Sequence, residues 1–274
     1  MNYKTILTKL GFYDTYQHLS FPKSGRTWVQ YMLSSISSQE TGKEINAVLE
    51  SNAPTFQKTA PARKRVQVQF SHGVDNYDLC RDGSFRKDIY TGKQAILLFR
   101  NPRDVLISYY YHEKWRSKNF SGSLSDFIRC DDQNAPEHEK HKLRWGIRPI
   151  VNYYNTLYRE KDCFKKHKIF FYEEFREEPE ENLRALLDFC NISCSEDRLQ
   201  YALESGQFKN MKKMEQKGEI SYYGLKKAED QRGSKVRKAK VNSYKEEMEQ
   251  DDIDFCNQYL TQHLDDFFAR YKTT

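Results

Sequence analysis

The chain has 274 residues, of which 38% are hydrophobic and 14% aromatic, and its formal net charge is +6. This content of bulky apolar residues excludes a wholly disordered or collagen-like chain. The mean hydropathy of −0.91 and the 31% of charged residues exclude a membrane-spanning helix. Lys4, Lys9, Asp14 and His18 interrupt the N-terminal region, so we expect no signal peptide and a cytoplasmic protein.

Short apolar runs predict four buried strands, at 17–21, 66–70, 95–99 and 168–172. Helical spacing predicts helices over 27–37, 102–116 and 179–190, the second with Asn101 as its N-cap. Strands that alternate with helices predict a parallel sheet, which binds ligands at the carboxyl ends of its strands. No internal repeat or low-complexity run divides the chain, so we expect one domain over 1–274.

The segment between Leu203 and Tyr244 loses helical periodicity, contains four glycines and predicts a mobile loop. From Gln207 to Lys245 it carries 12 Lys or Arg against 4 Asp or Glu, so the basic character of the chain is local. Such a patch suits RNA, an acidic membrane surface or a phosphorylated ligand, and also a solvated loop. Beyond it, 245–271 regains helical spacing and is expected to pack against the core.

The six cysteines are scattered along the chain without a C-x-x-C pair. Only Cys190 and Cys194 are close in sequence, and no histidine-rich stretch accompanies them. We therefore expect reduced thiols and no bound metal.

The turn after the first predicted strand has the sequence FPKSGRTW over 21–28 and leads into a helix. Its lysine, hydroxyl groups and backbone N–H donors would converge at the positive end of the helix dipole, where an anion is stabilised. The Walker A pattern is absent, because the turn has one glycine and Lys23 precedes it. Alone, the turn fits either a phosphate site or a capped helix start with a solvated lysine.

The turn after the third predicted strand has the sequence FRNPRDVLISYY over 99–110. Arg100 leaves the strand where a guanidinium can bind a phosphate through two hydrogen bonds, and Ser108 lies two turns into the next helix. Arg103 and Asp104 equally fit a surface ion pair.

Together, the two turns resemble those of the sulfotransferases that use 3′-phosphoadenosine 5′-phosphosulfate (PAPS). In that family a [TF]-[YF]-P-K-[ST]-G-[TS]-[TS]-W loop holds the 5′-phosphosulfate, and an R-N-P-[KR]-D-x-x-x-S-[YF]-[YF] segment holds the 3′-phosphate. The chain departs from the first pattern at Arg26, where the family has Thr or Ser. The resemblance implies that Lys23 contacts the bridging oxygen and that Trp28 stacks on adenine. It further implies contacts to the 5′-phosphate from Ser24, Gly25, Arg26 and Thr27, and to the 3′-phosphate from Arg100 and Ser108.

A weaker match resembles the family's strand that ends in a catalytic histidine. The sequence is VQVQFSH over 66–72, with Phe70-Ser71 in place of a frequent Lys-Thr pair. His72 is therefore implied as the general base, since a neutral imidazole can take a proton near pH 7. The remaining histidines are expected to be structural or exposed: His18, His112, His138, His141, His167 and His263.

Three further segments follow in the family's order. FFYEE over 170–174 implies that Tyr172 hydrogen-bonds the adenine, and QFKNMKK over 207–213 implies that Phe208 covers its second face. VRKAKVNSYK over 236–245 resembles an R-K-G-x-x-G-D-W-K segment in which both glycines and the Asp-Trp pair are replaced. Arg237 and Lys238 remain and would bind the 3′-phosphate, and 207–245 would form a basic lid over the nucleotide.

The resemblance implies one α/β domain with a central parallel sheet flanked by helices, in the P-loop NTPase-like sulfotransferase fold. It implies transfer of a sulfuryl group from PAPS to a hydroxyl or amine of a small soluble acceptor, which gives 3′,5′-ADP without a metal. Tailoring of a natural product is one such reaction. Neither nucleic acid nor a membrane is an expected partner, and the oligomeric state stays open.

The acceptor is not identified by the sequence. Aromatic clusters at 12–13, 77, 109–111 and 222–223 fit an acceptor pocket, but core packing accounts for them better. The acidic residues of 131–139 fit a cationic acceptor or a solvated loop. Two other functions remain as alternatives: a small-molecule kinase that uses ATP, and a non-catalytic protein that binds a nucleotide or RNA.

Overall fold

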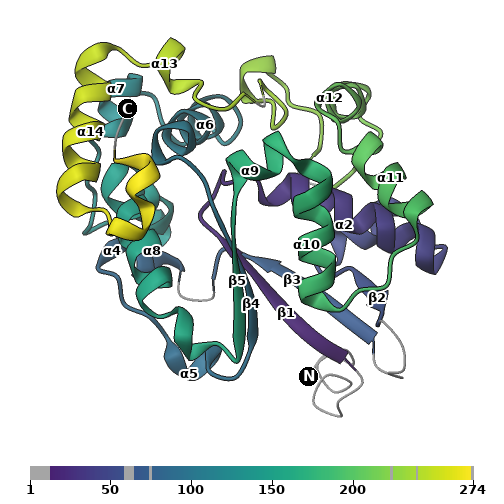
Figure 1. Ribbon diagram of the computed structural model, residues 1–274. Coiled ribbons are helices and arrows are strands. Elements are labelled where there is room, and N and C mark those ends of the chain that lie inside the picture. The colour runs from purple at the N-terminus through teal and green to yellow at the C-terminus, as the bar shows by residue number, and fades with distance from the viewer. Residues whose placement is uncertain (1–12, 59–64, 74–75, 223–224, 239, 273–274) are drawn as a thin grey trace.

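A single sheet of five strands forms the centre of the molecule (Figure 1). The computed structural model describes residues 13–58, 65–73, 76–222, 225–238 and 240–272; Lys4, Lys9, Phe12, Tyr223 and Ala239 lie outside them. The strand order is β2-β3-β1-β4-β5. The strands are β1 (Tyr13–Ser20), β2 (Thr55–Gln57), β3 (Arg65–Ser71), β4 (Gln94–Phe99) and β5 (Lys166–Phe171).

Four of the strands are parallel, as the sequence predicts. β1 pairs with β3 on one side and β4 on the other, and β5 pairs with β4. The short strand β2 is an antiparallel edge on β3 that the sequence analysis missed, because its three residues are too few for a periodic pattern. Thus the predicted α/β class with a mostly parallel sheet is confirmed.

Helices cover both faces of the sheet (Figure 1). One face packs mainly against α6 (Pro102–Trp115), α8 (Ile147–Arg159), α14 (Gln250–His263) and the 3-10 helix η4 (Asp266–Tyr271). The other packs against α2 (Arg26–Thr41), α10 (Pro179–Cys190) and α11 (Glu196–Ser205). The remaining helices are shorter: α3 (Ile45–Glu50), α4 (Asn76–Arg81), α5 (Lys87–Tyr90), α7 (Leu124–Ile128), α9 (Tyr172–Glu177), α12 (Phe208–Lys217), α13 (Tyr244–Glu247), and the 3-10 helices η1 (Glu137–Arg144), η2 (Lys161–Cys163) and η3 (Gln231–Gly233).

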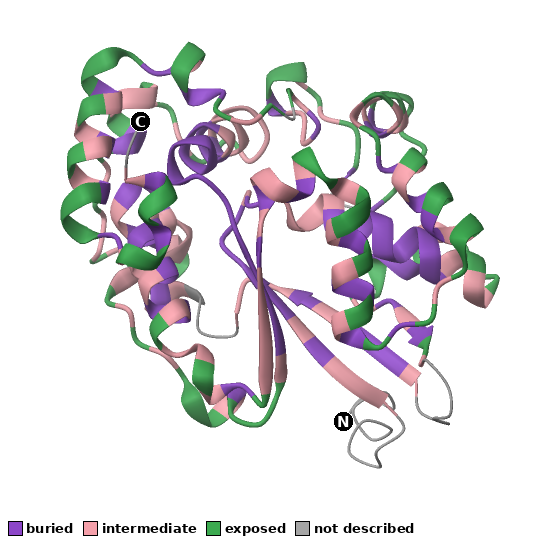
Figure 2. Cartoon of the chain, viewed as in Figure 1, coloured by how far each residue is buried: buried purple, intermediate pink, exposed green. Residues whose placement is uncertain are grey.

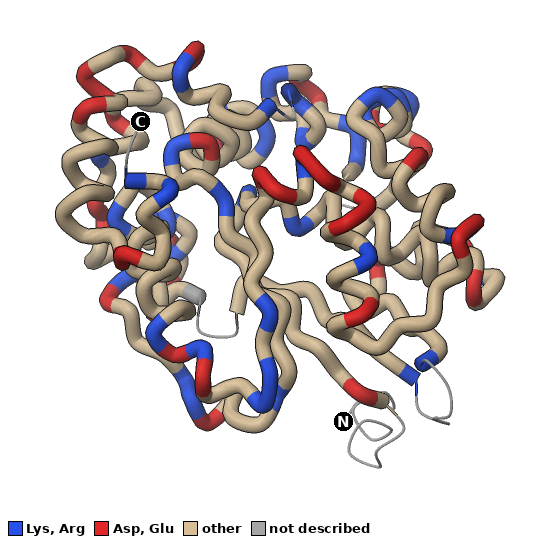
Figure 3. The backbone as a smooth tube through the Cα atoms, in the orientation of Figure 1, with Lys and Arg blue, Asp and Glu red and all other residues tan. Residues whose placement is uncertain are grey.

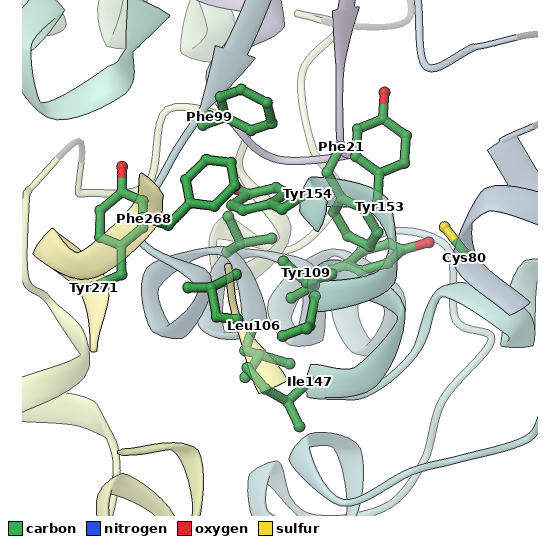
Figure 4. Packing of buried hydrophobic residues seen from close by; sticks show 14 of the residues in the cluster. Phe21, Cys80, Phe99, Leu106, Tyr109, Ile147, Tyr153, Tyr154, Phe268 and Tyr271 are labelled. Carbon is green, nitrogen blue, oxygen red and sulfur yellow. The ribbon is translucent and has the colours of Figure 1, made fainter. Parts of the chain in front are cut away.

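The sheet is buried on both faces because its strands alternate between two cores (Figure 2). In β4, Leu97 and Phe99 enter the first core and Ile96 and Leu98 the second. Figure 4 shows Phe99 against Phe268 of η4, with ring centroids 4.8 Å apart, so the C-terminal segment packs on the core as predicted. All six cysteines are free thiols. No helix in the described part of the chain is long and apolar enough to cross a membrane.

The prediction of a loop between 203 and 244 is wrong for its first part, where α12 forms. Two glycines flank this helix and do not interrupt it: Gly206 precedes it, and Gly218 is its C-cap, with a left-handed φ of 70°. Met211 and Glu215 are its buried residues, whereas Lys209, Lys213 and Lys217 are exposed. Figure 3 shows this concentration of basic residues on α12. The helix was missed because its buried stripe is narrow and includes a charged residue.

Candidate active site

The parallel strands end together, and this brings the predicted turns to one cavity. Leu19 of β1 is paired with Ser71 of β3, and Phe99 of β4 with Phe171 of β5. The cavity has a volume of about 260 Å³. Nearly all of the predicted site residues line it: Lys23, Gly25, Arg26, Thr27, Trp28, His72, Arg100, Ser108, Tyr172, Phe208, Arg237 and Lys238. Ser24 is fully buried beneath the loop, and its N–H donates to Phe21 O at 3.2 Å.

The loop after β1 has the conformation of an anion-binding turn. Lys23 and Gly25 both have a positive φ, 72° and 101°. The helix α2 begins at Arg26, and the first N–H groups of a helix have no partner within it, so they are available at the end of α2 that lies at the cavity. A Cβ at residue 25 would lie 2.4 Å from a ring atom of Tyr172, so only glycine fits there.

Arg100 is fixed at the end of β4 by its surroundings. Its guanidinium donates to Lys23 O at 3.1 Å, lies 4.3 Å from the centroid of the Tyr172 ring, and approaches Asp104 at 4.0 Å. Its Nε is buried without a hydrogen-bond partner among the described residues. An oxyanion in the cavity would satisfy this donor.

Aromatic side chains form another part of the cavity wall. The indole N–H of Trp28 donates to Gly206 O at 2.8 Å, and the Trp28 ring meets Tyr172 edge to face at 5.8 Å. Trp28 and Phe208 pack against the same apolar cluster, which includes Tyr31 and Tyr222. Flat apolar surfaces of this kind suit a purine ring.

His72 lies at the end of β3 with its ring in the cavity. Its Nδ1 lies 2.9 Å from Ser20 O. Because a carbonyl only accepts, Nδ1 carries the proton and Nε2 is left as a proton acceptor. Burial, and then repulsion from Arg26, lower the pKa of His72 well below its usual 6.5. The imidazole is therefore neutral at physiological pH, as a base requires.

A second lysine, Lys235, lines the same cavity, and its side chain interacts with that of Lys23. Burial, and repulsion from Lys235, Arg116 and Arg100, hold the pKa of Lys23 well below 10.5. Burial and repulsion from Arg116 and Arg26 lower the pKa of Lys235 to about 8. Such mutual repulsion between cations would be relieved by a bound polyanion. The sequence analysis missed Lys235, because no motif marks it within a run of lysines.

Buried carboxylates fix the segment that carries Lys235. Glu215 of α12 accepts hydrogen bonds from the N–H groups of Lys235 and Val236, at 2.8 and 3.1 Å. Asp104 of α6 accepts from the N–H groups of Asn242 and Tyr244, at 2.8 and 3.1 Å. These two attachments hold the described residues on either side of position 239 against α12 and α6.

The surface ion pair expected of Arg103 and Asp104 is wrong, since both side chains are buried. Arg103 hydrogen-bonds Asn257 and donates to Tyr271 O at 2.9 Å, which ties α6 to the C-terminal helices. Sequence reasoning missed this role because both partners lie more than 150 positions away in the chain.

Arg237 and Lys238 line the cavity but are paired with a carboxylate. Arg237 makes two hydrogen bonds to Glu247, at 2.7 and 2.9 Å, and Lys238 pairs with the same carboxylate at 3.1 Å. The Arg237 guanidinium also lies 4.0 Å from the Tyr111 ring centroid. Glu247 therefore partly balances the positive charge that Arg237 and Lys238 bring to the cavity.

His112 and Arg144 also line the cavity, although no sequence motif singled them out. His112 Nδ1 is buried without a partner among the described residues, and burial lowers the pKa of this histidine. The expectation that His112 is merely structural or exposed is therefore wrong with respect to its place, since it lies on the cavity wall.

Known proteins resemble the chain in sequence and fold. A family model described as the sulfotransferase domain matches residues 19–268. Sulfotransferase 2A6 of Mus musculus is 26% identical over 224 residues, 78% of this chain and 70% of that protein. The fold is similar to mouse sulfotransferase SULT7A1 complexed with PAP, with a TM-score of 0.62, 16% identity and coverage of 99% of this chain and 94% of that one. It is also similar to retinol dehydratase in complex with androsterone and PAP, with a TM-score of 0.59, 15% identity and coverage of 92% and 81%. Because the family model spans most of its length, the chain belongs to the sulfotransferase family.

Proposed function

We propose that this sulfotransferase transfers the sulfuryl group of PAPS to a hydroxyl or amino group of a small acceptor and releases 3′,5′-ADP. The observation that carries the proposal is the convergence of Lys23, Arg100 and His72 with aromatic walls in one cavity. Cations balance the phosphates of such a nucleotide, and aromatic rings cover its base. The PAP bound to two structural relatives supports the same nucleotide.

The residues would share the nucleotide as follows. Lys23 contacts the bridging oxygen, and the loop over 24–27 binds the 5′-phosphate through its backbone N–H and hydroxyl groups, so the guanidinium of Arg26 is not needed for this contact. Trp28 and Phe208 cover the adenine, with Tyr172 at its edge. The 3′-phosphate is bound by Arg100, Ser108, Arg237 and Lys238. Residues 207–245 form a basic lid over the nucleotide.

The proposed chemistry is an in-line displacement at sulfur. The Nε2 of His72 takes the proton of the acceptor, and the acceptor atom forms a bond to sulfur. The bond between sulfur and the bridging oxygen breaks, and its electron pair stays on the 5′-phosphate of 3′,5′-ADP. Lys23 and Lys235 stabilise this charge as it develops. A sulfuryl group carries less negative charge than a γ-phosphoryl group, so these cations suffice without a metal.

Retinol dehydratase supports an acceptor of small size, since it is bound to androsterone in one structure and to retinol in another. The decisive experiment compares thermal unfolding with 3′,5′-ADP and with ATP plus Mg²⁺, because a ligand of the folded state raises the melting temperature. We expect a much larger shift with 3′,5′-ADP, and labelled sulfate transferred from PAPS to an acceptor. A larger shift with ATP and Mg²⁺ would favour the kinase, and binding of 3′,5′-ADP without transfer to any acceptor would favour a non-catalytic protein.

A further inference from the structure

Arg144, at the end of η1, presents an unneutralised guanidinium to the cavity. It lies over the rings of Tyr77 and Tyr109, 4.9 and 5.9 Å from their centroids. Its Nε is buried and has no hydrogen-bond partner among the described residues, and no described carboxylate forms an ion pair with it. Glu113 lines the same cavity and is one of the groups that raise the pKa of Arg144, after Tyr109, Tyr77 and Cys80 and against the effect of burial, but it forms no ion pair with Arg144.

Arg26 is a second cation of this kind. It lines the cavity, and no described residue forms a hydrogen bond or an ion pair with it. Burial is the largest cause of the lowering of its pKa, and repulsion from Arg144 adds to it. Two partly buried guanidinium groups that repel each other are costly without an anion between them.

Both guanidinium groups line the same cavity as His72, to which the acceptor must present its proton. Each of them lowers the pKa of His72. Arg144 comes from η1, whereas the nucleotide residues come from the turns after β1, β4 and β5 and from the segment over 207–245. The acidic residues of 131–139 do not line this cavity, and Asp131 instead pairs with Arg148 at 2.8 Å.

We propose that the acceptor is an anion: a hydroxy compound with a carboxylate, sulfate or phosphate group, which Arg144 and Arg26 bind while its hydroxyl faces His72. The proposal rests on the proposed sulfuryl transfer. Guanidinium groups favour such oxyanions because they donate two parallel hydrogen bonds. A cationic or neutral acceptor would leave both charges uncompensated, so the same two residues select against it.

The test measures binding to the full chain saturated with 3′,5′-ADP, by isothermal titration. The probes are the three hydroxybenzoates, each against its methyl ester, and 4-hydroxyphenyl phosphate against its neutral dimethyl ester, with tyramine as the cation. We expect at least one acid to bind 10-fold or more tightly than its ester, and tyramine to bind weakly. In Arg144→Gln this ratio should fall close to one, Arg144→Lys should restore part of it, and Arg26→Thr should lower it. Lys142→Gln removes another cation of η1, one that pairs with Glu139, and should keep the wild-type ratio.

Three outcomes would overturn the proposal. The acids could bind no more tightly than their esters, including the case in which neither binds. The acid-to-ester ratio could survive in Arg144→Gln. Arg144→Gln could weaken the binding of 3′,5′-ADP as much as it weakens the binding of the acid, which would show that Arg144 binds the nucleotide. None of these three outcomes would contradict the proposed sulfuryl transfer. That proposal would fail if the protein did not bind 3′,5′-ADP or did not consume PAPS.

Discussion

Glu215 accepts a hydrogen bond from the backbone N–H of Lys235 at 2.8 Å, and this bond joins α12 to the turn that carries a cavity lysine. The same carboxylate accepts from Ser234 and Val236 and lies 3.4 Å from Arg116. It is almost fully buried. The central part of the basic segment is therefore built around one carboxylate.

Replacement of Glu215 by Ala should destabilise the protein by about 3–5 kcal/mol, because it removes the carboxylate that pairs with the buried Arg116 and accepts several hydrogen bonds from residues 234–236. It should also weaken the binding of 3′,5′-ADP, because the backbone of Lys235 is no longer held by this hydrogen bond. Urea denaturation and nucleotide titration measure the two effects. Glu229 pairs with Lys118 on the surface, where solvent screens the pair, so the control Glu229→Ala should hardly change the free energy of unfolding. Equal losses in the two variants would contradict this account.

The pKa of about 8 for Lys235 predicts an alkaline limit to catalysis. In the free enzyme the ammonium loses its proton above this pH, so kcat/KM for PAPS should fall above about pH 8. Lys235→Arg keeps the charge and should extend the plateau to higher pH, whereas Lys227→Arg, at an exposed site, should not. An unchanged profile in Lys235→Arg would exclude Lys235 as the group that titrates.

The lowered pKa of His72 predicts that its imidazole stays neutral at pH 6. A base with the usual pKa would be mostly protonated there, so the rate would fall; here kcat should be nearly the same at pH 6 and pH 7. The acceptor used should not titrate between pH 6 and pH 7, so that any change in kcat comes from the enzyme. His72→Ala should lose about 10²–10⁴-fold in kcat and still bind 3′,5′-ADP. Turnover near the wild-type rate in His72→Ala would refute its role as base.

Gly25→Ala should abolish nucleotide binding, because the added Cβ would lie 2.4 Å from a ring atom of Tyr172 and displace the ring from Arg100. The matched control is Gly42→Ala. Gly42 also has a positive φ, 67°, but no atom within 4 Å of the added Cβ. Both variants place a Cβ at a positive φ, which costs about 1 kcal/mol or more, but Gly42 is the C-cap at the other end of α2, so only Gly25→Ala should lose affinity for 3′,5′-ADP. Equal affinities would show that the contact with Tyr172 does not shape the site.

The sheet and the loop after β1 could be predicted because they depend on local sequence. Apolar runs of strand length marked four strands, and Asn101 caps α6 as its residue type predicts, accepting from the Arg103 N–H at 3.0 Å. Parallel strands end at one edge, so the residues after each strand had to meet there. Ser24, which the motif names as a phosphate contact, is fully buried and is not among the residues that line the cavity.

Long-range contacts decided the rest. Lys235, Arg144 and His112 reach the cavity from segments without a motif, and only the folded chain brings them to His72 and Lys23. The buried carboxylates Asp104 and Glu215 hold the basic segment through its backbone N–H groups, which every residue type has, so the sequence carries no sign of these bonds. The sequence alone therefore determined four of the five strands, the loop after β1 and the family. The charge around the acceptor depends on the distances between side chains remote in sequence, and only the tertiary structure could decide it.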